Sequence, residues 1–360
     1  MTAITAHPPA SSVVGQRPTA TWTGNLVTAL GGMWMVIGLL YDGHTHVFTH
    51  GLESFFTPAH GVLYGGFLAT AGWVLAQVLR ARRAGRPAPA GYGLGLLGAG
   101  AFLAGGLADL GWHTLFGIEA DLEALLSPTH LVLFTGAALL LTTPWRAAWS
   151  TPGEDAPGTR EFLPVLLSAT AMLTFVGFFV SYLSPFIGHI APTTAAMAQL
   201  GGPPHSEQLE QFQARGIANL LATTVLLVGA LLLVLRRWHP PAGTATVLFA
   251  ATAVALDAVF EFQAAWLLLA SLVGGLAGDA LVAWLRPAPN RPWALRAVGG
   301  LVPLALWLPY MGLLAAGYGL AWSAPVWAGA VVLSGLTGFA LALLAAPPPV
   351  PAGRGSRRTA

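Results

Sequence analysis

Apolar stretches of about 20 residues recur along nearly the whole chain, and short segments rich in Arg, Pro or Gly separate them. A helix of that length crosses the hydrocarbon core of a bilayer. The pattern predicts ten spans, near residues 24–41, 58–79, 91–112, 128–143, 162–184, 216–235, 244–262, 263–285, 297–318 and 325–345. The boundary between the seventh and the eighth is the least defined, because apolar character never lapses there. We therefore expect an all-α, polytopic integral membrane bundle of about ten transmembrane helices.

The composition supports this prediction and narrows the chemistry. Of the 360 residues, 55% are hydrophobic and 8% are charged, whereas about 25% are charged in soluble domains. There is no Cys, which excludes disulfides and thiolate metal sites and leaves His, carboxylate, Met and backbone oxygen as metal ligands. The N-terminal segment has no apolar run, so we expect disordered cytoplasmic tails at residues 1–20 and 347–360 rather than a signal peptide.

Arginine is distributed unevenly between the two sides of the predicted bundle. With the N-terminus in the cytoplasm, fifteen of the sixteen Arg residues fall on the cytoplasmic side and only Arg215 falls outside. This follows the positive-inside rule. We therefore expect a bacterial inner membrane protein with both termini in the cytoplasm, and we ascribe the basic charge to orientation in the bilayer rather than to nucleic acid.

Eight of the ten His residues and ten of the fourteen acidic residues fall near outer helix ends or in outer loops under the same topology. Outer loops could simply avoid Arg and take other polar residues. A duplicated pattern argues against that explanation. Two segments that start 67 residues apart, at 42 and 109, each contain an Asp, a His four residues later, and then Thr or Ser, Pro, any residue and His. These residues are Asp42, His46 and His60 in the first copy and Asp109, His113 and His130 in the second.

The spacing indicates that each copy gathers its three side chains at one point. Residues four apart share a helix face. Thr or Ser before Pro is typical of a helix start, which places the last His in the first turn of the next helix. We predict two tandem metal-binding hairpins within residues 21–143, near 24–79 and 91–143. One carboxylate and two imidazoles suit copper, zinc or iron, and copper binds most tightly of the three. Alternatively, Asp42 and His46 form a buried hydrogen-bonded pair and His60 only caps a loop.

At these residues the sequence resembles the third subunit of the copper-containing particulate methane and ammonia monooxygenases. That family carries Asp-x-x-Trp-His followed by Phe-Thr-Pro-Ser-His, which is similar to Asp42, His46 and Phe56-Thr57-Pro58-Ala59-His60, the Trp appearing in the second copy as Trp112. Its downstream site, Asn-x-x-x-His-Thr-Phe, then Glu and Pro-x-His, is similar to Asp109, His113-Thr114-Leu115-Phe116, Glu119 and Pro128-Thr129-His130. The resemblance covers residues 25–143 and implies copper, a monooxygenase-type activity, and oligomers or companion subunits.

The second copy departs from the family more than the first. Asp109 replaces an Asn, and 16 residues separate His113 from His130 where 13 separate His46 from His60. We therefore expect the first centre to bind metal more tightly. Residues 144–346 carry six further predicted helices without any resemblance.

Other polar residues are candidates for accessory roles. His44 and His50 could add a ligand or orient one, and Glu53, Glu119 and Glu123 could relay protons or form a polar loop face. His189 and His205 bracket an outer loop. Asp257 and Glu261 lie four residues apart in a predicted helix. They could be a degenerate third copy of the metal-binding pattern, a proton site or an internal pair. Asp279 could pair with Arg286 or face a cavity.

Three functions remain open from sequence. The first is a copper-dependent oxidation of a small apolar substrate dissolved in the bilayer. The second is non-enzymatic storage, sensing or transfer of copper or another transition metal from the outer compartment, and a receptor or structural role is a third. Ligands that crowd one face do not line a path across the membrane, which disfavours an exporter.

Overall fold

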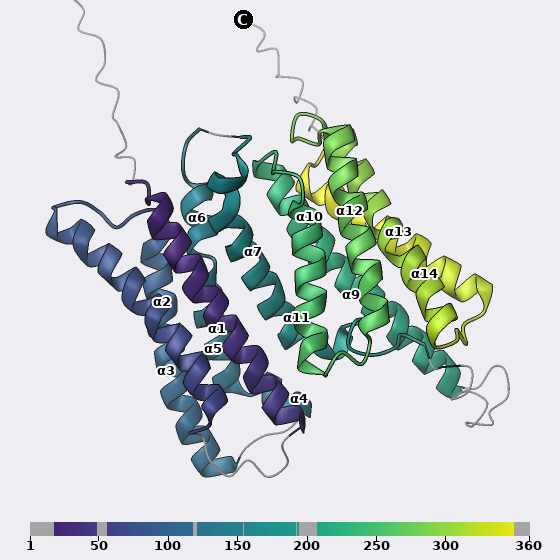
Figure 1. Cartoon of the computed structure of the whole chain (residues 1–360), viewed down its shortest axis with the longest axis horizontal. Coiled ribbons are helices and arrows are strands. Elements are labelled where there is room, and N and C mark those ends of the chain that lie inside the picture. The colour runs from purple at the N-terminus through teal and green to yellow at the C-terminus, as the bar shows by residue number, and fades with distance from the viewer. Residues whose placement is uncertain are drawn as a thin grey trace, which may run out of the picture.

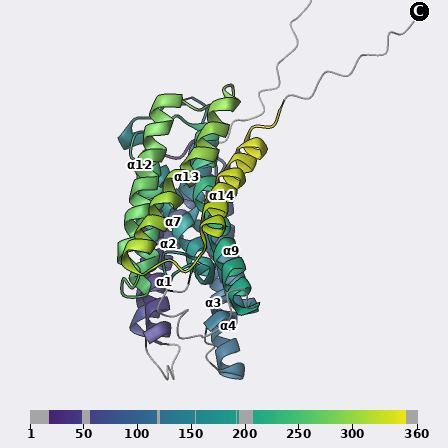
Figure 2. The same cartoon turned by 90° about the vertical axis from the view of Figure 1, so that its right-hand side faces the viewer.

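The protein is described by a computed structural model over residues 18–48, 56–117, 121–153, 155–191, 193 and 207–348, except for the side chains of 121, 123, 124 and 208. Within these residues the fold is all-helical and has no β-strand. The helices lie side by side in one bundle, and the first helix starts at the end of the bundle where the last one finishes (Figure 1). The view from the side shows α14, in yellow, finishing at that end (Figure 2).

The helices follow one another along the chain with short connections. The first half contains α1 (Trp22–Phe48), α2 (Pro58–Arg83), α3 (Tyr92–Phe116), α4 (Asp121–Leu126), α5 (Pro128–Leu141), α6 (Thr143–Trp149), α7 (Thr159–Phe179) and the 3₁₀ turn η1 (Ser181–Leu183). The second half contains α9 (Glu207–Arg237), α10 (Thr244–Thr246), the π-helical η2 (Val247–Ala251), α11 (Thr252–Val259), η3 (Ala265–Leu267), α12 (Leu268–Leu285), α13 (Pro292–Gly317) and α14 (Ala324–Ala345).

Eight of these helices are long and apolar enough to cross a membrane, and a ninth candidate is the pair α5 and α6, which is bent by 43°. The segment Thr244–Val259 is apolar but shorter. All ten predicted stretches coincide with helical segments, which confirms the polytopic helical bundle and is compatible with an integral membrane protein. The boundaries shift most at α9, which starts nine residues before the predicted 216.

The chain breaks between α11 and η3, where the hydropathy pattern left the boundary undefined. Glu261 and Phe262 have φ values of 56° and 59°, a left-handed conformation that non-glycine residues rarely adopt. Asp257 stabilises the break, because its Oδ1 accepts a hydrogen bond from the backbone N–H of Ala264 at 3.2 Å. The continuous apolar run hid this break because no Gly or Pro marks it.

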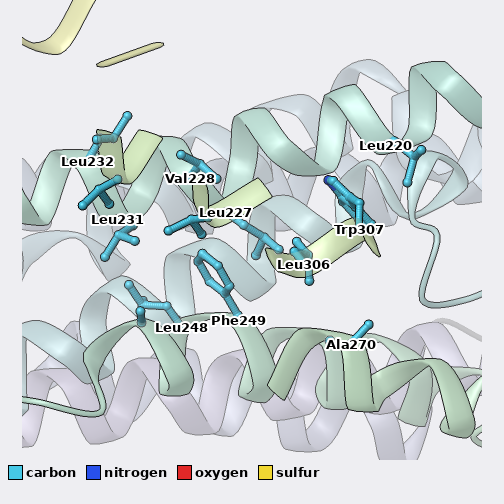
Figure 3. Close-up of a cluster of buried hydrophobic side chains, with 14 of the residues drawn as sticks. Leu220, Leu227, Val228, Leu231, Leu232, Leu248, Phe249, Ala270, Leu306 and Trp307 are labelled. Atoms are coloured by element: carbon cyan, nitrogen blue, oxygen red, sulfur yellow. The ribbon is translucent and has the colours of Figure 1, made fainter. Parts of the chain in front are cut away.

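Two hydrophobic cores share helix α7. The first lies among α1, α2, α3, α5 and α7 and contains Phe67, Phe102 and Phe175. The second lies among α7 and α9 to α14, where Leu227, Leu231, Phe249 and Trp307 interdigitate (Figure 3). Because α7 contributes to both clusters, the two halves of the chain form one continuous packed body.

Helices α1 and α2 approach closely because glycines face the partner backbone. A Cβ atom at Gly38 would lie 2.5 Å from Leu63 Cα, and one at Gly66 would lie 2.5 Å from the Met35 backbone nitrogen. Small residues allow this kind of contact between membrane helices, where packing rather than water drives association. The close approach fixes the distance between the end of α1 and the start of α2.

The apolar helix Thr244–Val259 starts against a carboxylate from a neighbouring helix. Asp279 of α12 accepts hydrogen bonds from the backbone N–H groups of Ala245 at 2.9 Å and Thr246 at 3.0 Å, and from the Thr246 hydroxyl at 2.6 Å. These N–H groups belong to the first helical turn, which has no partner within its own helix. Asp279 therefore caps α10 from α12; no ion pair with Arg286 is found in the described part of the chain.

Candidate metal centres

The six predicted ligands come from four helices and lie at one end of them. Asp42 and His46 lie in the last two turns of α1, and Asp109 and His113 in those of α3. His60 lies in the first turn of α2 and His130 in the first turn of α5, each two residues after the Pro that starts the helix. The structure thus brings both predicted triads together.

The local sequence at each helix start explains where these histidines lie. Thr57 caps α2, since its hydroxyl accepts a hydrogen bond from the backbone N–H of His60 at 3.1 Å. Ser127 precedes α5 at the equivalent position but makes no such cap bond. Its Oγ lies 2.7 Å from Nδ1 of His130 instead. The predicted N-cap positions are therefore confirmed in both copies, but only Thr57 forms a cap hydrogen bond, because the Ser127 hydroxyl contacts the His130 imidazole instead.

In the first cluster the carboxylate of Asp42 lies between the two imidazoles. Its Oδ2 is 3.8 Å from Nε2 of His46, and its Oδ1 is 3.4 Å from Nε2 of His60. A separation of 3.8 Å is too long for a hydrogen bond. The alternative prediction of an Asp42–His46 hydrogen-bonded pair is therefore wrong.

The second cluster has the same arrangement and is more deeply buried. The Oδ2 of Asp109 is 3.3 Å from Nε2 of His113, and Oδ1 is 3.5 Å from Nε2 of His130. The Asp109 side chain is 3% exposed, against 13% for Asp42. In each cluster the three ligand atoms lie within 4.8 Å of one another.

Hydrogen bonds orient the side chains of the second cluster. The hydroxyl of Thr129 donates to Asp109 Oδ1 at 2.7 Å, and Nδ1 of His113 lies 3.1 Å from the carbonyl oxygen of Gly117. A carbonyl oxygen only accepts, so Nδ1 of His113 donates in this contact, and Nε2 is the ring nitrogen that faces Asp109. Metal-ligating imidazoles are usually held by such a hydrogen bond on the second ring nitrogen.

The distances fit a bound ion better than direct contact. Imidazole nitrogen and carboxylate oxygen ligands lie about 2.0–2.2 Å from a transition metal, which places two tetrahedral ligands about 3.3–3.5 Å apart. The four nitrogen to oxygen distances range from 3.3 to 3.8 Å. Small side-chain rotations would bring all three atoms of either cluster onto one ion.

The charges also favour a cation at these positions. Within the described residues, neither Asp42 nor Asp109 has an Arg within 4 Å, and Oδ1 of Asp42 is buried without a hydrogen-bond donor. An unpaired carboxylate is costly in a membrane helix. The two His/Asp clusters can therefore each hold a metal ion.

A cavity of about 50 Å³ lies between the clusters. Asp42, His60, Asp109 and His130 reach its wall, and so does Tyr64 of α2. The remaining lining is apolar and includes Met35, Leu63, Phe102, Leu133, Phe175 and Phe179. The last two belong to α7, outside the predicted metal-binding unit of residues 21–143. Sequence reasoning missed Tyr64, although its position one turn after His60 placed it on the ligand face.

The accessory candidates have different outcomes. His44 does not join the first cluster, because its Nδ1 lies 3.0 Å from the carbonyl oxygen of Val259, which ties the end of α1 to the end of α11. The ring of His189 contacts that of Tyr318, with 4.1 Å between ring centroids. His50, Glu53, Glu119 and His205 lie outside the described residues, and Glu123 lies in α4 with its side chain undescribed.

Asp257 and Glu261 do not repeat the Asp/His register. Helix α11 ends at Val259, so Glu261 lies in the turn beyond it and is exposed, whereas Asp257 is fully buried. The prediction that they share a helix face is wrong because the backbone leaves the helix between them.

Comparisons with known proteins add no relative to this picture. No family model matches the chain, and no significant match is found among curated proteins or solved structures.

Proposed function

We propose that the chain is a copper-binding integral membrane protein whose two centres, at Asp42/His46/His60 and Asp109/His113/His130, serve the oxidation of a small apolar substrate. The observation that carries the proposal is the pair of Asp/His/His clusters around one largely apolar cavity. Copper is preferred because its affinity for nitrogen and oxygen ligands exceeds that of iron or zinc.

The residues around the centres support an oxidation chemistry. Copper in such a site would supply redox chemistry and coordinate a small molecule. Asp42 and Asp109 would neutralise part of its charge, and the contact of His113 Nδ1 with Gly117 leaves Nε2 as the ring nitrogen that would bind the metal. Phe175 and Phe179 would make part of the cavity wall apolar and favour an apolar substrate. The resemblance to the third subunit of the membrane monooxygenases is consistent with this assignment.

A second function, storage or transfer of copper, has one observation in its favour. The side chains of His46 and His130 are 29% and 23% exposed, so copper could exchange through them with an outside acceptor. Under either function we propose that the centres face the outer side of a bacterial inner membrane and that the chain forms oligomers or binds companion subunits.

Metal analysis tests the shared part of both proposals. Protein purified in detergent from copper-replete cells, without chelator, should contain two copper ions per chain, and Asp42→Ala should contain about one. His239→Ala is the matched control, because His239 is exposed and belongs to neither cluster. A chain without copper, zinc or iron contradicts metal binding.

Dioxygen uptake then separates the two functions. Copper-loaded protein in lipid nanodiscs, supplied with a reductant, should consume dioxygen faster when a short alkane is added, and His60→Ala should abolish the increase. Storage or transfer predicts no alkane-dependent uptake and, instead, rapid movement of copper to a soluble acceptor.

A further inference from the structure

The two clusters share one cavity rather than opening onto separate pockets. Asp42 and His60 reach it from α1 and α2, and Asp109 and His130 reach it from α3 and α5. His46 of the first cluster also lies within electrostatic range of Asp109 and His113 of the second. A cavity needs a volume of about 10–15 Å³ to hold one water molecule. The cavity of about 50 Å³ therefore has room for about four waters or one linear triatomic ion.

Tyr64 lies between the two clusters. Its ring centroid is 6.0 Å from that of His60, one turn earlier on α2, and 6.0 Å from that of Phe102 on α3. A Cβ atom at Gly106, one turn before Asp109, would lie 2.7 Å from the Tyr64 hydroxyl oxygen. Tyr64 is within electrostatic range of both carboxylates. The Tyr64 hydroxyl therefore extends from the first hairpin to the second, into the space that is open because Gly106 has no side chain.

The second hairpin has no counterpart of this hydroxyl. Phe134 follows His130 by four residues, as Tyr64 follows His60. Its ring packs against Phe175 and Phe179 of α7, with centroids 5.1 and 4.7 Å away. Among the described lining residues, Tyr64 is thus the single polar one that belongs to neither ligand set.

Resting on the proposed metal binding, we propose that the two clusters form one bimetallic centre whose ions share a small ligand in the cavity, with Tyr64 as its positioning residue. The ligand class is a linear anion or diatomic molecule that coordinates a metal. The hydroxyl of Tyr64 orients it, and the phenylalanines of α7 exclude larger polar molecules.

Azide is a suitable probe, because it is linear, triatomic and gives a charge-transfer band when it binds Cu(II). The copper-loaded protein should saturate at one azide per two copper ions. In His130→Ala, which keeps the copper of the first cluster, the azide affinity should fall at least tenfold. Independent centres predict a different result, with about half the amplitude at unchanged affinity.

Tyr64→Phe tests the positioning role. The variant should keep both copper ions, bind azide about tenfold more weakly and shift the charge-transfer band, because a hydrogen bond to a charged group contributes about a factor of ten. Tyr41→Phe is the control, since Tyr41 is 43% exposed and lies outside the cavity lining. Leu133→Phe, which fills the cavity, should exclude azide while copper stays bound.

The outcomes distinguish the two proposals. A protein without copper, zinc or iron overturns metal binding and the bimetallic centre together. Two copper ions whose azide affinities are unchanged by His130→Ala overturn only the shared cavity. Unchanged azide binding in Tyr64→Phe removes the role of Tyr64.

Discussion

Removal of the Thr129 hydroxyl should selectively weaken the second metal centre. In Thr129→Val the side chain keeps its shape, but Asp109 Oδ1 loses the hydrogen bond that the hydroxyl donates at 2.7 Å. Asp109 is almost fully buried, so water cannot easily replace the lost donor. The carboxylate is then free to turn away from His113 and His130.

The expected magnitude follows from that one bond. A hydrogen bond to a charged group contributes about 1.5–3 kcal/mol, which corresponds to about a 10- to 100-fold change in affinity at 1.4 kcal/mol per factor of ten. Loss of an outer hydrogen bond to a metal ligand typically has an effect of about the same size. A free carboxylate is also the stronger base, which acts in the opposite direction, but we expect the loss of orientation to dominate at a buried site.

Competition with copper chelators of graded strength measures this effect. A weaker chelator should remove one ion from Thr129→Val than is needed to remove one from the unsubstituted chain. The ion that remains should be the one that is lost when His60 is substituted. Thr135→Val is the control, because Thr135 lies on the same helix, is exposed and bonds only its own helix backbone. Unchanged release, or loss of the ion that depends on His60, would refute the reasoning.

The same experiment decides the order of the two centres. The sequence spacing predicts that the first centre binds more tightly. The structure favours the reverse order, because Asp109 accepts the Thr129 hydrogen bond, whereas the equivalent residue in the first copy is Ala59 and Oδ1 of Asp42 has no donor. We therefore expect the Asp109 ion to be the last one removed.

The remaining predictions concern topology, stability and composition. The chain has no Cys, so single cysteines are clean probes: an impermeant thiol reagent should label the Glu53 and Glu119 loops on intact cells and should not label positions 83, 153 or 291, and labelling at 83 would overturn the orientation. Asp279→Ala should lower the unfolding free energy by about 2–3 kcal/mol, because two backbone N–H groups and one hydroxyl lose their acceptor; thermal unfolding in detergent measures it, and a wild-type midpoint would contradict the cap. His60→Ala should remove about one metal ion per chain by elemental analysis, and retention of both would show that His60 is not a ligand.

Much of the fold could be predicted from the sequence because hydropathy and spacing are local signals. The ten apolar stretches and the i, i+4 register of Asp42 with His46 need only helix geometry. The Thr-Pro start of α2 likewise fixes His60 in a first turn. These features depend on neighbours within a few residues.

The parts that failed have no signal in the local hydropathy pattern, and two of them depend on contacts between helices. The Asp257 carboxylate bonds the backbone across the break after Val259, and Glu261 has a left-handed backbone conformation there. The local sequence pattern contains no signal for this break. Phe179 reaches the cavity only because α7 packs beside α1 and α5. The sequence also could not show that Thr129 bonds Asp109, since that bond crosses the interface of two helices.

The place of α7 in the cavity wall has a consequence for biosynthesis. The last ligand is His130, whereas the wall is completed by Phe179, 49 residues further along the chain. Ribosomes add about 5–20 residues per second, so the ligands precede the completed wall by roughly 2–10 s at that rate. During this interval the nascent chain carries both ligand sets without the aromatic residues that close them off, and a metal ion that arrives then would meet an open site. A chain truncated after α6 should accordingly take up copper faster than the full-length protein and lose it faster.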